Sequence, residues 1–343
     1  MVLVLGIETS CDETAAAIAR GPGENGVEVV SSVVASQDEL HARFGGIVPE
    51  VASRRHIEMI VPVVREAMTR ASASWDDLDG IAVTTGPGLI GSLVVGLSTA
   101  KAIAQARRLP LAGVHHLEGH IYSAAIGRRL PLPLLALIAS GGHSHLVLVR
   151  DHGRYEVLGR TRDDAPGEAF EKAGRLLGLP YPGGPRLAAL ADSYRGRLEP
   201  MPQARIAESW DFSFSGVKTH LARHVRGRQL GDDERASLAA AFQESVAGAL
   251  AEKTVRAAEE IGGLPILLVG GVARNRRLRA LMEERAFSAG LRVNTAAPEY
   301  CTDNGAMIAA AGIYRLHLRA AETAELDCAA NLPLRDWAGP GSS

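Results

Sequence analysis

Hydrophobic and polar positions along the chain form two successive blocks with the same order of predicted elements. In the first block, an apolar run and a polar turn lead into two more strands and a helical stretch, and then a strand, a glycine turn, a helix and a strand follow. The predicted strands are 2–8, 15–19, 27–34, 79–84 and 111–114. Two helices are predicted, one that begins near Pro49 and one that covers about 93–107. Pro62 should kink or divide the first helix.

The second block repeats this order. Its predicted strands are 134–139, 145–150, 155–160, 264–269 and 291–294, with helices at 167–177, 233–261, from Asn275 to about Ala289, and at about 304–318. The residues 181–185 are expected to form a glycine turn. The two blocks share a pattern but not residue identity. They predict two like α/β lobes with a cleft between them, and ligands in α/β sheets bind at the carboxyl ends of strands.

Composition narrows the protein class. The chain has 343 residues, enough for two domains, with 46% apolar and 22% charged residues, which is ordinary for a globular protein. Its net charge of −2 means that any contact with RNA needs a local basic patch or a partner. Cys11, Cys301 and Cys328 are too few and too scattered for a disulfide framework. No secretory signal or 18-residue apolar run is visible, so a cytoplasmic protein without a membrane span is expected.

The segment 114–120 contains the strongest chemical signal. His116 and His120 stand four residues apart, which on an α-helix places both imidazoles on one face, within reach of one cation. Neutral imidazole is a common ligand for zinc and iron. Glu118 suggests the zinc-protease pattern H-E-x-x-H, but at about 100° per residue it points away from the His pair. The helix geometry therefore argues against a protease.

A third metal ligand must come from elsewhere in the chain. Asp303 is the first candidate, although it precedes a helix and could simply cap it. His115, His143 and His145 are further candidates. Two His and one carboxylate leave coordination positions open, which suits Fe(2+), or Zn(2+) in a catalytic role.

Glycine turns follow buried strands in both halves. Ser140-Gly141-Gly142 can aim several backbone N–H groups at one anion, and Gly270-Gly271-Val272 precedes a helix start that favours negative charge. Each could be an ordinary turn, but their matching positions favour a nucleotide site. The P-loop and Rossmann signatures are both absent. Asp12 and Glu13, in the first polar turn, are acids available for proton transfer, unless they only form a solvated turn.

These segments together resemble one family over almost the whole chain, through about residue 320. The sequence is similar to the tRNA N6-adenosine threonylcarbamoyltransferases, the TsaD group, formerly described as O-sialoglycoprotein endopeptidases. The resemblance rests on eight motifs: Gly6-Ile7-Glu8-Thr9-Ser10-Cys11-Asp12-Glu13-Thr14, Gly86-Pro87-Gly88-Leu89, His116-Leu117-Glu118-Gly119-His120, Ser140-Gly141-Gly142-His143, Tyr181-Pro182-Gly183-Gly184-Pro185, Phe212-Ser213-Phe214-Ser215-Gly216, Gly270-Gly271-Val272 with Asn275, and Cys301-Thr302-Asp303-Asn304.

The resemblance implies the actin-like ATPase (ASKHA) fold, with two duplicated RNase H-like lobes and a nucleotide and metal cleft between them. It implies an acyltransferase of tRNA modification, which moves the threonylcarbamoyl group from threonylcarbamoyl-AMP to the exocyclic amine of the adenosine 3′ of the anticodon. The tRNAs concerned read codons that begin with A. The implied partners are a TsaB-like paralogue and a TsaE-like ATPase.

The same resemblance assigns roles to residues. It implies one divalent metal, Fe(2+) favoured and Zn(2+) possible, held by His116, His120 and Asp303. The implied adenylate-binding residues are Ile138, Ala139, Ser140, Gly141, Gly142, Glu171, Gly184 and Asn275. Glu171 is a departure, since the family commonly has Asp there. Our mechanistic hypothesis adds Asp12 as the general base, with Glu13 second.

We expect an N-terminal lobe of residues 1–114, completed by a helix at about 304–320, a C-terminal lobe of 115–303, and a mobile tail at 337–343. The basic helix after Asn275 could touch tRNA phosphates or be a solvated face. Two other functions are considered: a metalloprotease, and an actin-like sugar kinase or scaffold that would not need His116.

Overall fold

The computed structural model describes residues 1–204, 206, 208–318 and 326–337, which divide into two compact units. Unit 1 comprises residues 1–132, 149–155 and 296–343, and unit 2 comprises 133–148 and 156–295. The first division therefore falls after Leu132, whereas the sequence predicted it after Val114. The difference arises because the helix that carries the His pair packs on the last helix of the chain, within unit 1.

Unit 1 is built on a five-stranded sheet with the strand order β3-β2-β1-β4-β5. Its strands are β1 (Val2–Glu8), β2 (Thr14–Gly23), β3 (Gly26–Ala35), β4 (Gly80–Gly86) and β5 (Leu111–His115). The first three strands are antiparallel neighbours, while β4 and β5 run parallel to β1. Because β1, β4 and β5 are parallel, Glu8, Gly86 and His115 end at the same edge of the sheet.

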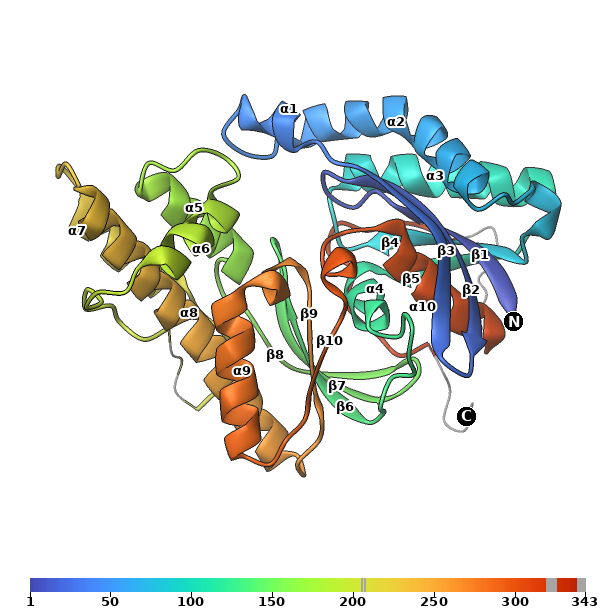
Figure 1. Cartoon of the computed structure of the whole chain (residues 1–343). Coiled ribbons are helices and arrows are strands. Elements are labelled where there is room, and N and C mark those ends of the chain that lie inside the picture. The colour runs from blue at the N-terminus through green and yellow to red at the C-terminus, as the bar shows by residue number, and fades with distance from the viewer. Residues whose placement is uncertain (205, 207, 319–325, 338–343) are drawn as a thin grey trace. The chain divides into compact units, whose positions relative to one another are not determined.

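Helices cover both faces of this sheet, as Figure 1 shows. Long helices α2 (Pro49–Arg70) and α3 (Ile90–Arg107) pack on one face, and α4 (His116–Ser123) and α10 (Gly305–His317) on the other. Short elements complete the unit: α1 (Asp38–Ala42) and the 3-10 helices η1 (Trp75–Asp77) and η3 (Pro298–Tyr300). Leu5, Ile7 and Ile81 form the core with apolar residues of α2 and α3.

Pro62 does not divide α2, contrary to the sequence prediction. The proline side chain faces solvent, where the carbonyl that lacks its helical partner can bond to water. Ile60, Val63 and Val64 on the opposite side of the helix are buried in the core. Burial of this apolar face stabilises a continuous helix in spite of the proline.

Helix α10 lies directly against β1 and β2, and this close approach depends on glycine. A Cβ added at Gly6 would lie 2.4 Å from the backbone of Ala309, and one at Gly305 would lie 2.6 Å from the backbone of β2 at Ala16. Real Cβ atoms do not approach backbone this closely, so any larger residue would push the helix away from the sheet. The two glycines therefore fix the start of α10, two residues after Asp303.

Unit 2 repeats the sheet topology. Its strands are β6 (Leu134–Ala139), β7 (Ser144–Asp151), β8 (Arg154–Arg160), β9 (Ile266–Val269) and β10 (Val293–Thr295), with the far ends of β7 and β8 counted in unit 1. The strand order is β10-β9-β6-β7-β8. Counted from the first strand of each sheet, this is the order of the first sheet. The predicted duplication is thus present in the fold.

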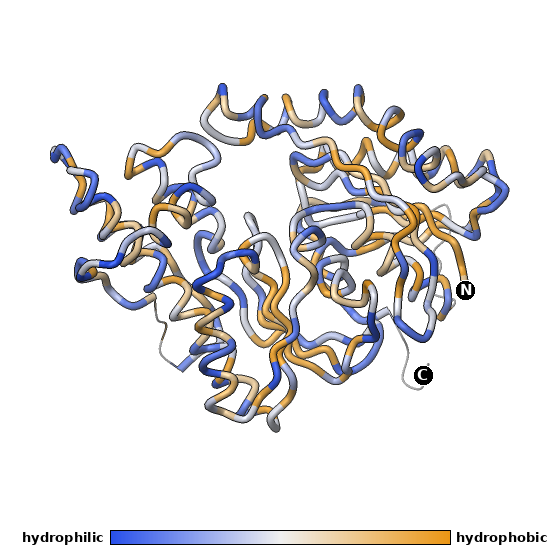
Figure 2. Tube along the Cα trace, in the orientation of Figure 1, coloured by the Kyte–Doolittle hydropathy of each residue, from blue (hydrophilic) through white to orange (hydrophobic). Residues whose placement is uncertain are grey.

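The helices of unit 2 are α5 (Pro166–Leu176), α6 (Gly183–Ser193), α7 (Ser215–Val225), α8 (Asp232–Glu260) and α9 (Arg276–Ser288), with the 3-10 helix η2 (Gly271–Arg274). The sequence predicts neither α6 nor α7: residues 181–185 indicate a turn where α6 begins, and no helix is predicted at 215–225. Figure 2 shows apolar residues gathered in the strands and a mixture of apolar and hydrophilic residues along the helices. Among the described residues, no helix has both the length and the apolar content needed to cross a membrane.

Candidate metal centre

Strand β5 leads directly into α4, as the sequence predicted, and every residue of this helix is buried. His115 is the N-cap residue: its Nδ1 accepts a hydrogen bond from the backbone N–H of Leu117 at 3.2 Å. Its Nε2 lies 2.9 Å from the carbonyl oxygen of Leu332, to which it can donate. Both ring nitrogens of His115 therefore have partners that fix the start of the helix, which removes it as a candidate ligand.

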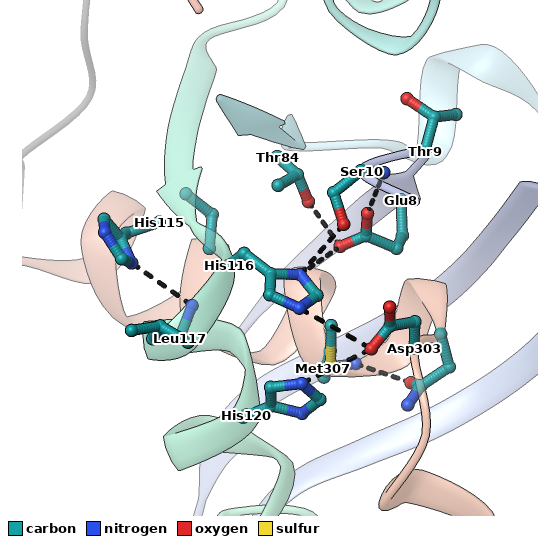
Figure 3. Close-up of polar contacts among 12 residues, drawn as sticks. Glu8, Thr9, Ser10, Thr84, His115, His116, Leu117, His120, Asp303 and Met307 are labelled. Carbon is teal, nitrogen blue, oxygen red and sulfur yellow. Dashed lines mark hydrogen bonds and ion pairs between the residues drawn. The ribbon is translucent and has the colours of Figure 1, made fainter. Parts of the chain in front are cut away.

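His116, His120 and Asp303 converge on one point. Asp303 Oδ1 lies 3.6 Å from His116 Nε2 and 3.3 Å from His120 Nε2. The two imidazole rings are 4.7 Å apart between centroids and nearly perpendicular. One ligand atom from each residue falls within 4.8 Å of the other two. The predicted trio is therefore brought together within unit 1, as Figure 3 shows.

The alternative role for Asp303, as a helix cap, is wrong. Asn304 is the N-cap residue of α10, and its Oδ1 accepts the backbone N–H of Met307 at 2.9 Å. The carboxylate of Asp303 is thus left to face the histidines. The other candidates, His143 and His145, lie in unit 2, where their rings are 5.8 Å apart.

A buried carboxylate orients His116 from behind. Glu8 at the end of β1 is fully buried, and its Oε2 lies 3.2 Å from His116 Nδ1 (Figure 3). The backbone N–H of Ser10 donates to Glu8 Oε1 at 2.5 Å, and Thr84 Oγ1 donates to Oε2 at 2.6 Å. The contact between Glu8 and His116 Nδ1 holds the imidazole ring so that its Nε2 is directed towards Asp303. Carboxylates commonly hold metal-binding histidines in this way.

The two imidazoles differ in charge. Burial alone would lower the pKa of His116, but Asp303 and Glu8 outweigh it and raise the pKa to about 9. Burial lowers the pKa of His120, and His116 opposes its protonation further. In the metal-free protein at neutral pH, His116 is therefore an imidazolium between two carboxylates, and His120 is neutral.

The site fits a divalent cation. Two ligand atoms held about 2.1 Å from one ion at a tetrahedral angle lie about 3.4 Å apart, close to the Asp303 distances above. Both ring nitrogens of His120 are buried; among the described residues Nδ1 lacks a hydrogen bond and Nε2 faces only Asp303 Oδ1 at 3.3 Å, an arrangement that a ligand at Nε2 would make less costly. The Asp303 side chain is 20% exposed, so one side of the trio is open.

We expect metal binding to release about one proton at pH 7.5. A divalent ion must displace the proton on His116, whose pKa is about 9, so affinity should rise with pH up to that value, by about tenfold per unit. Calorimetric titration with Zn(2+) in buffers of different ionisation enthalpy counts the proton. Glu8→Gln, which removes one of the two carboxylates that stabilise the imidazolium, should release less. Binding without proton release in the parent protein would contradict this charge assignment.

Glu118 points away from the His pair, as its position on the helix predicted. Its carboxylate is fully buried and accepts hydrogen bonds from Arg315 Nη2 at 2.7 Å, Tyr155 OH at 3.0 Å and Trp337 Nε1 at 2.5 Å. The Arg315 guanidinium also lies over the Trp337 ring. All of these residues belong to unit 1. A carboxylate engaged in this way cannot activate a water at the metal, so the protease function is not favoured.

The segment 326–337 lies beside the end of β4 in unit 1. Ala329 N–H donates to Thr85 O at 2.9 Å, and Gly88 N–H donates to Ala330 O at 3.1 Å. Trp337, which the sequence placed in a mobile tail, also donates its backbone N–H to Gly153 O at 3.1 Å. The tail prediction does not hold for Trp337, and residues 338–343 lie outside the described residues.

Comparisons with known proteins find related proteins over most of the chain. The family model of tRNA N6-adenosine threonylcarbamoyltransferase matches residues 28–310. The relative of that name from Symbiobacterium thermophilum is 51% identical over 314 residues, covering 91% of each chain. The one from Geobacillus thermodenitrificans is 50% identical over 315 residues, again covering 91% of each.

This chain belongs to the tRNA N6-adenosine threonylcarbamoyltransferase family. It is accordingly a transferase of tRNA modification. The crystal structure of HypF from T. kodakarensis is 16% identical, covers 92% of this chain and 48% of its own, and superposes with a TM-score of 0.63. Together with the two sheets of matching order, this confirms the actin-like ATPase fold.

In this family member the turn after β1 carries the two candidate acids. Asp12 is 7% exposed, and the neighbouring Cys11 carbonyl lies 3.0 Å from His56 Nε2 of α2, which holds the turn in place. Burial, followed by Asp303 and Asp12, raises the pKa of Glu13 well above its usual range. Glu13 therefore holds its proton to a higher pH than an ordinary glutamate does, which is consistent with its place as the second candidate base.

The predicted adenylate residues Ile138 to Gly142 lie at the end of β6 and in the turn that follows. Because β6 and β9 are parallel, with Ile138 opposite Val269, this turn and Gly270 reach the same edge of the second sheet. Gly270 has φ +93°, and a Cβ there would lie 2.4 Å from the carbonyl oxygen of Ala139. A Cβ at Gly141 or Gly142 would meet no atom within 4 Å. The two turns are thus brought together, with open space at Gly141.

Glu171 and Asn275 have partners within unit 2. The Glu171 carboxylate accepts the backbone N–H groups of Gly183 at 2.8 Å and Gly184 at 2.9 Å, at the start of α6. Asn275 is the N-cap residue of α9, where its Oδ1 accepts from Leu278 N–H at 2.9 Å and its Nδ2 donates to Gln243 at 2.7 Å. Binding of a substrate by these side chains stays a prediction, and it would have to use their remaining hydrogen-bonding capacity.

Sequence reasoning gave no role to Glu8, Ser10 and Thr84. The signal that could have found them is a single carboxylate, Glu8, that ends an otherwise apolar strand, since a buried acid needs partners. Thr84 lies on the neighbouring parallel strand β4, which pairs with β1. The sequence does not give the register of β1 against β4, so neither the contact of Thr84 with Glu8 nor that of Glu8 with His116 could be inferred from it.

Proposed function

We propose that this chain transfers the threonylcarbamoyl group of threonylcarbamoyl-AMP to the exocyclic amine of the adenosine 3′ of the anticodon, in tRNAs that read codons beginning with A. The single observation that carries the proposal is family membership over 91% of the chain, to which the His–His–Asp cluster adds a matching candidate site.

The metal proposed for this reaction is one divalent ion, with Fe(2+) favoured and Zn(2+) possible. His116, His120 and Asp303 would hold it, because two imidazoles and one carboxylate suit both ions and leave positions open. When bound, such an ion supplies Lewis acidity that stabilises charge on a departing phosphate. Glu8 keeps the His116 ring in the orientation that ligation needs.

Residues of the chain are proposed to carry the remaining chemistry. The backbone N–H groups of Ser140, Gly141 and Gly142 would donate to a phosphate oxygen of the adenylate, since glycine allows close approach. The lone pair of an adenosine amine is delocalised into the ring, so attack on the carbamoyl carbon needs removal of a proton. Asp12 is proposed to accept that proton at its carboxylate, with Glu13 as the second candidate.

The proposal extends to partners and location. A TsaB-like paralogue would assemble with this chain, and a TsaE-like ATPase would act with it. The reaction is proposed to take place in the cytoplasm, which suits a tRNA substrate. These statements rest on the family resemblance, and the transfer assay tests the need for each partner by leaving it out.

The decisive experiment is reconstitution with threonine, bicarbonate, ATP, tRNA and the partner proteins, followed by mass spectrometry of the nucleosides. We expect threonylcarbamoyl adenosine to appear. A tRNA in which the adenosine 3′ of the anticodon is replaced by guanosine should stay unmodified. Product formation on that control, or none on the parent tRNA when a curated relative succeeds under the same conditions, would contradict the proposal.

The same preparation tests the other functions. A metalloprotease would cleave casein, and a sugar kinase would move phosphate from ATP to an acceptor without needing His116. We expect neither activity from a member of this family, and Glu118, which is bound to Arg315 and Trp337 rather than facing the His pair, argues against the protease in particular. Casein cleavage that disappears with the metal would revive the protease.

Replacing Gly141 with valine should weaken adenylate binding by about tenfold or more, while changing the free energy of unfolding by less than about 0.5 kcal/mol. A Cβ there meets no protein atom, so the fold tolerates it, but it would occupy the space proposed for the phosphate. Titration with a non-hydrolysable adenylate analogue and thermal unfolding give the two values. Gly231→Val, also in open space but at the start of α8, is the control. Unchanged affinity in Gly141→Val would remove this turn from the site.

A further inference from the structure

A groove in unit 2 concentrates positively charged side chains. Helices α5 and α7 pack against one another and enclose a volume of about 450 Å³ between them. Five of the residues that line it are cationic: Lys172 and Arg175 of α5, Lys218 and Arg223 of α7, and Arg226 just after α7. None of the described lining residues is acidic. The groove thus has the lining expected of an anion-binding site.

The charges form one surface because of helix periodicity. On α7, Ala222 lies four residues after Lys218, one helical turn further along the same side, and Arg226, just after the helix, lies three residues beyond Arg223. Leu176 of α5 and Ala222 supply small apolar contacts between the charged groups. Figure 1 shows where α5 and α7 lie, and Figure 2 shows hydrophilic residues alternating with apolar ones along α7.

Neighbouring acids neutralise only part of this charge. Asp164 contacts both lysines, at 2.8 Å for Lys172 and closer for Lys218, and Glu168 lies 2.7 Å from Lys172. These ion pairs hold the two lysines at the wall of the groove. Arg223 and Arg226, which also line the groove, are exposed. The chain as a whole carries a net charge of −2, so the positive charge of this groove is local.

We propose that the groove between α5 and α7 binds backbone phosphates of the tRNA substrate. This inference rests on the proposed function and adds the surface that the RNA contacts. A net-negative protein that acts on tRNA needs a local basic patch, because phosphate contacts supply most of the affinity. Arginine matches phosphate with its planar fork of donors. No aromatic residue is among the lining, so the contact positions the RNA without reading its bases.

The basic helix α9, which the sequence suggested for this role, is less suitable. Arg277 forms a two-point ion pair with Glu244, at 2.6 and 2.8 Å. Arg279 donates its Nε to the carbonyl oxygen of Ala273 at 2.5 Å. These side chains serve the fold of unit 2. Arg274 and Arg276 of this segment are exposed, so they provide a control of equal charge in the same unit.

The test replaces Arg223 and Arg226 together with alanine and measures tRNA binding by fluorescence anisotropy within the reconstituted assembly. Each lost phosphate contact should make the slope of log K against log[salt] shallower by about 0.9 and weaken binding about fivefold near 0.15 M salt. We therefore expect a Kd for tRNA about 10–30-fold higher and a slope shallower by about 2. The loss should be the same for substrate and non-substrate tRNAs, and kcat at saturating tRNA should be unchanged.

Arg274→Ala with Arg276→Ala should change the Kd by less than about threefold, since these residues lie outside the groove. An equal loss in both pairs would show a general charge effect and overturn the proposal. So would an unchanged Kd and salt slope in the α7 pair. Loss of partner assembly at unchanged tRNA affinity would make the groove an interface for an acidic protein instead. If the parent binds tRNA but forms no threonylcarbamoyl adenosine, the proposed function fails while the binding measurement still decides the groove.

Discussion

Replacing both His116 and His120 with alanine should remove the bound metal and reduce threonylcarbamoyl transfer by more than about a thousandfold, equivalent to ~4 kcal/mol of barrier. Two of the three ligand side chains disappear, and Asp303 alone cannot hold an ion against water. The double variant should lose more metal and more transfer activity than either single variant. Each single change already removes one of the three ligand side chains. Asp303→Asn, which preserves shape but removes charge, should weaken the metal without removing both imidazoles.

Metal content by elemental analysis and the rate of nucleoside formation are the two measurements. His152→Ala is a matched control, because it removes an imidazole of unit 1 that stacks on Tyr122 and Tyr314 rather than on the ligand trio. Circular dichroism and thermal unfolding establish that the double variant folds. Near-stoichiometric metal together with full activity in the double variant would show that the metal assignment is wrong.

Asp12→Asn should lower the single-turnover rate by about 10²–10⁴-fold, equivalent to roughly 3–5 kcal/mol. The change keeps the size of the side chain and its hydrogen-bonding capacity but removes the basic carboxylate. If Asp12 takes the proton from the adenosine amine, affinities for adenylate and tRNA should stay within about threefold of the parent. Glu13→Gln is the comparison. Because the pKa of Glu13 is raised, its carboxyl group is a weaker candidate for the base, and this substitution should lower the single-turnover rate less than Asp12→Asn does.

The pH dependence separates a base from a structural role. A carboxylate base works only when deprotonated, so the parent rate should fall on acidification through a group that the Asp12→Asn variant lacks. If Asp12 only orders the turn that His56 holds, metal content or ligand affinity should fall in step with the rate. A variant that keeps the acidic limb and loses less than about tenfold would exclude Asp12 as the base.

The parts of this molecule that were predicted well depend on local spacing. His116 and His120 share a face because they are one helical turn apart, and the same geometry placed Glu118 on the other side. The repeated strand order followed from hydrophobic periodicity. Asp303, in contrast, stayed ambiguous in the sequence, because an acid before a helix is also a common cap. Only the side chain of Asn304, which caps α10, removed that ambiguity.

The predictions that failed concern features that depend on tertiary contacts. Gly183, Gly184 and Pro185 indicate a turn, yet they form the first turn of α6. Proline is tolerated there because the first helical N–H groups have no partner within the helix, and Glu171 accepts those of the two glycines. From the sequence, Glu8 is only the last residue of a strand. Its contacts could not be inferred, because Thr84 and His116 lie 76 and 108 residues further along the chain.

The hydrogen bond from Trp337 to Glu118 also orders events in time. The two residues are 219 positions apart, and all of unit 2 is synthesised between them. While the chain is growing, Glu118 lacks both Arg315 and Trp337, so the polar core beneath α4 cannot close until residue 337 has left the ribosome. Asp303 likewise appears long after the His pair. The candidate metal centre is therefore completed late in synthesis, and a chain interrupted before Trp337 is left with a Glu118 carboxylate that lacks its full set of donors.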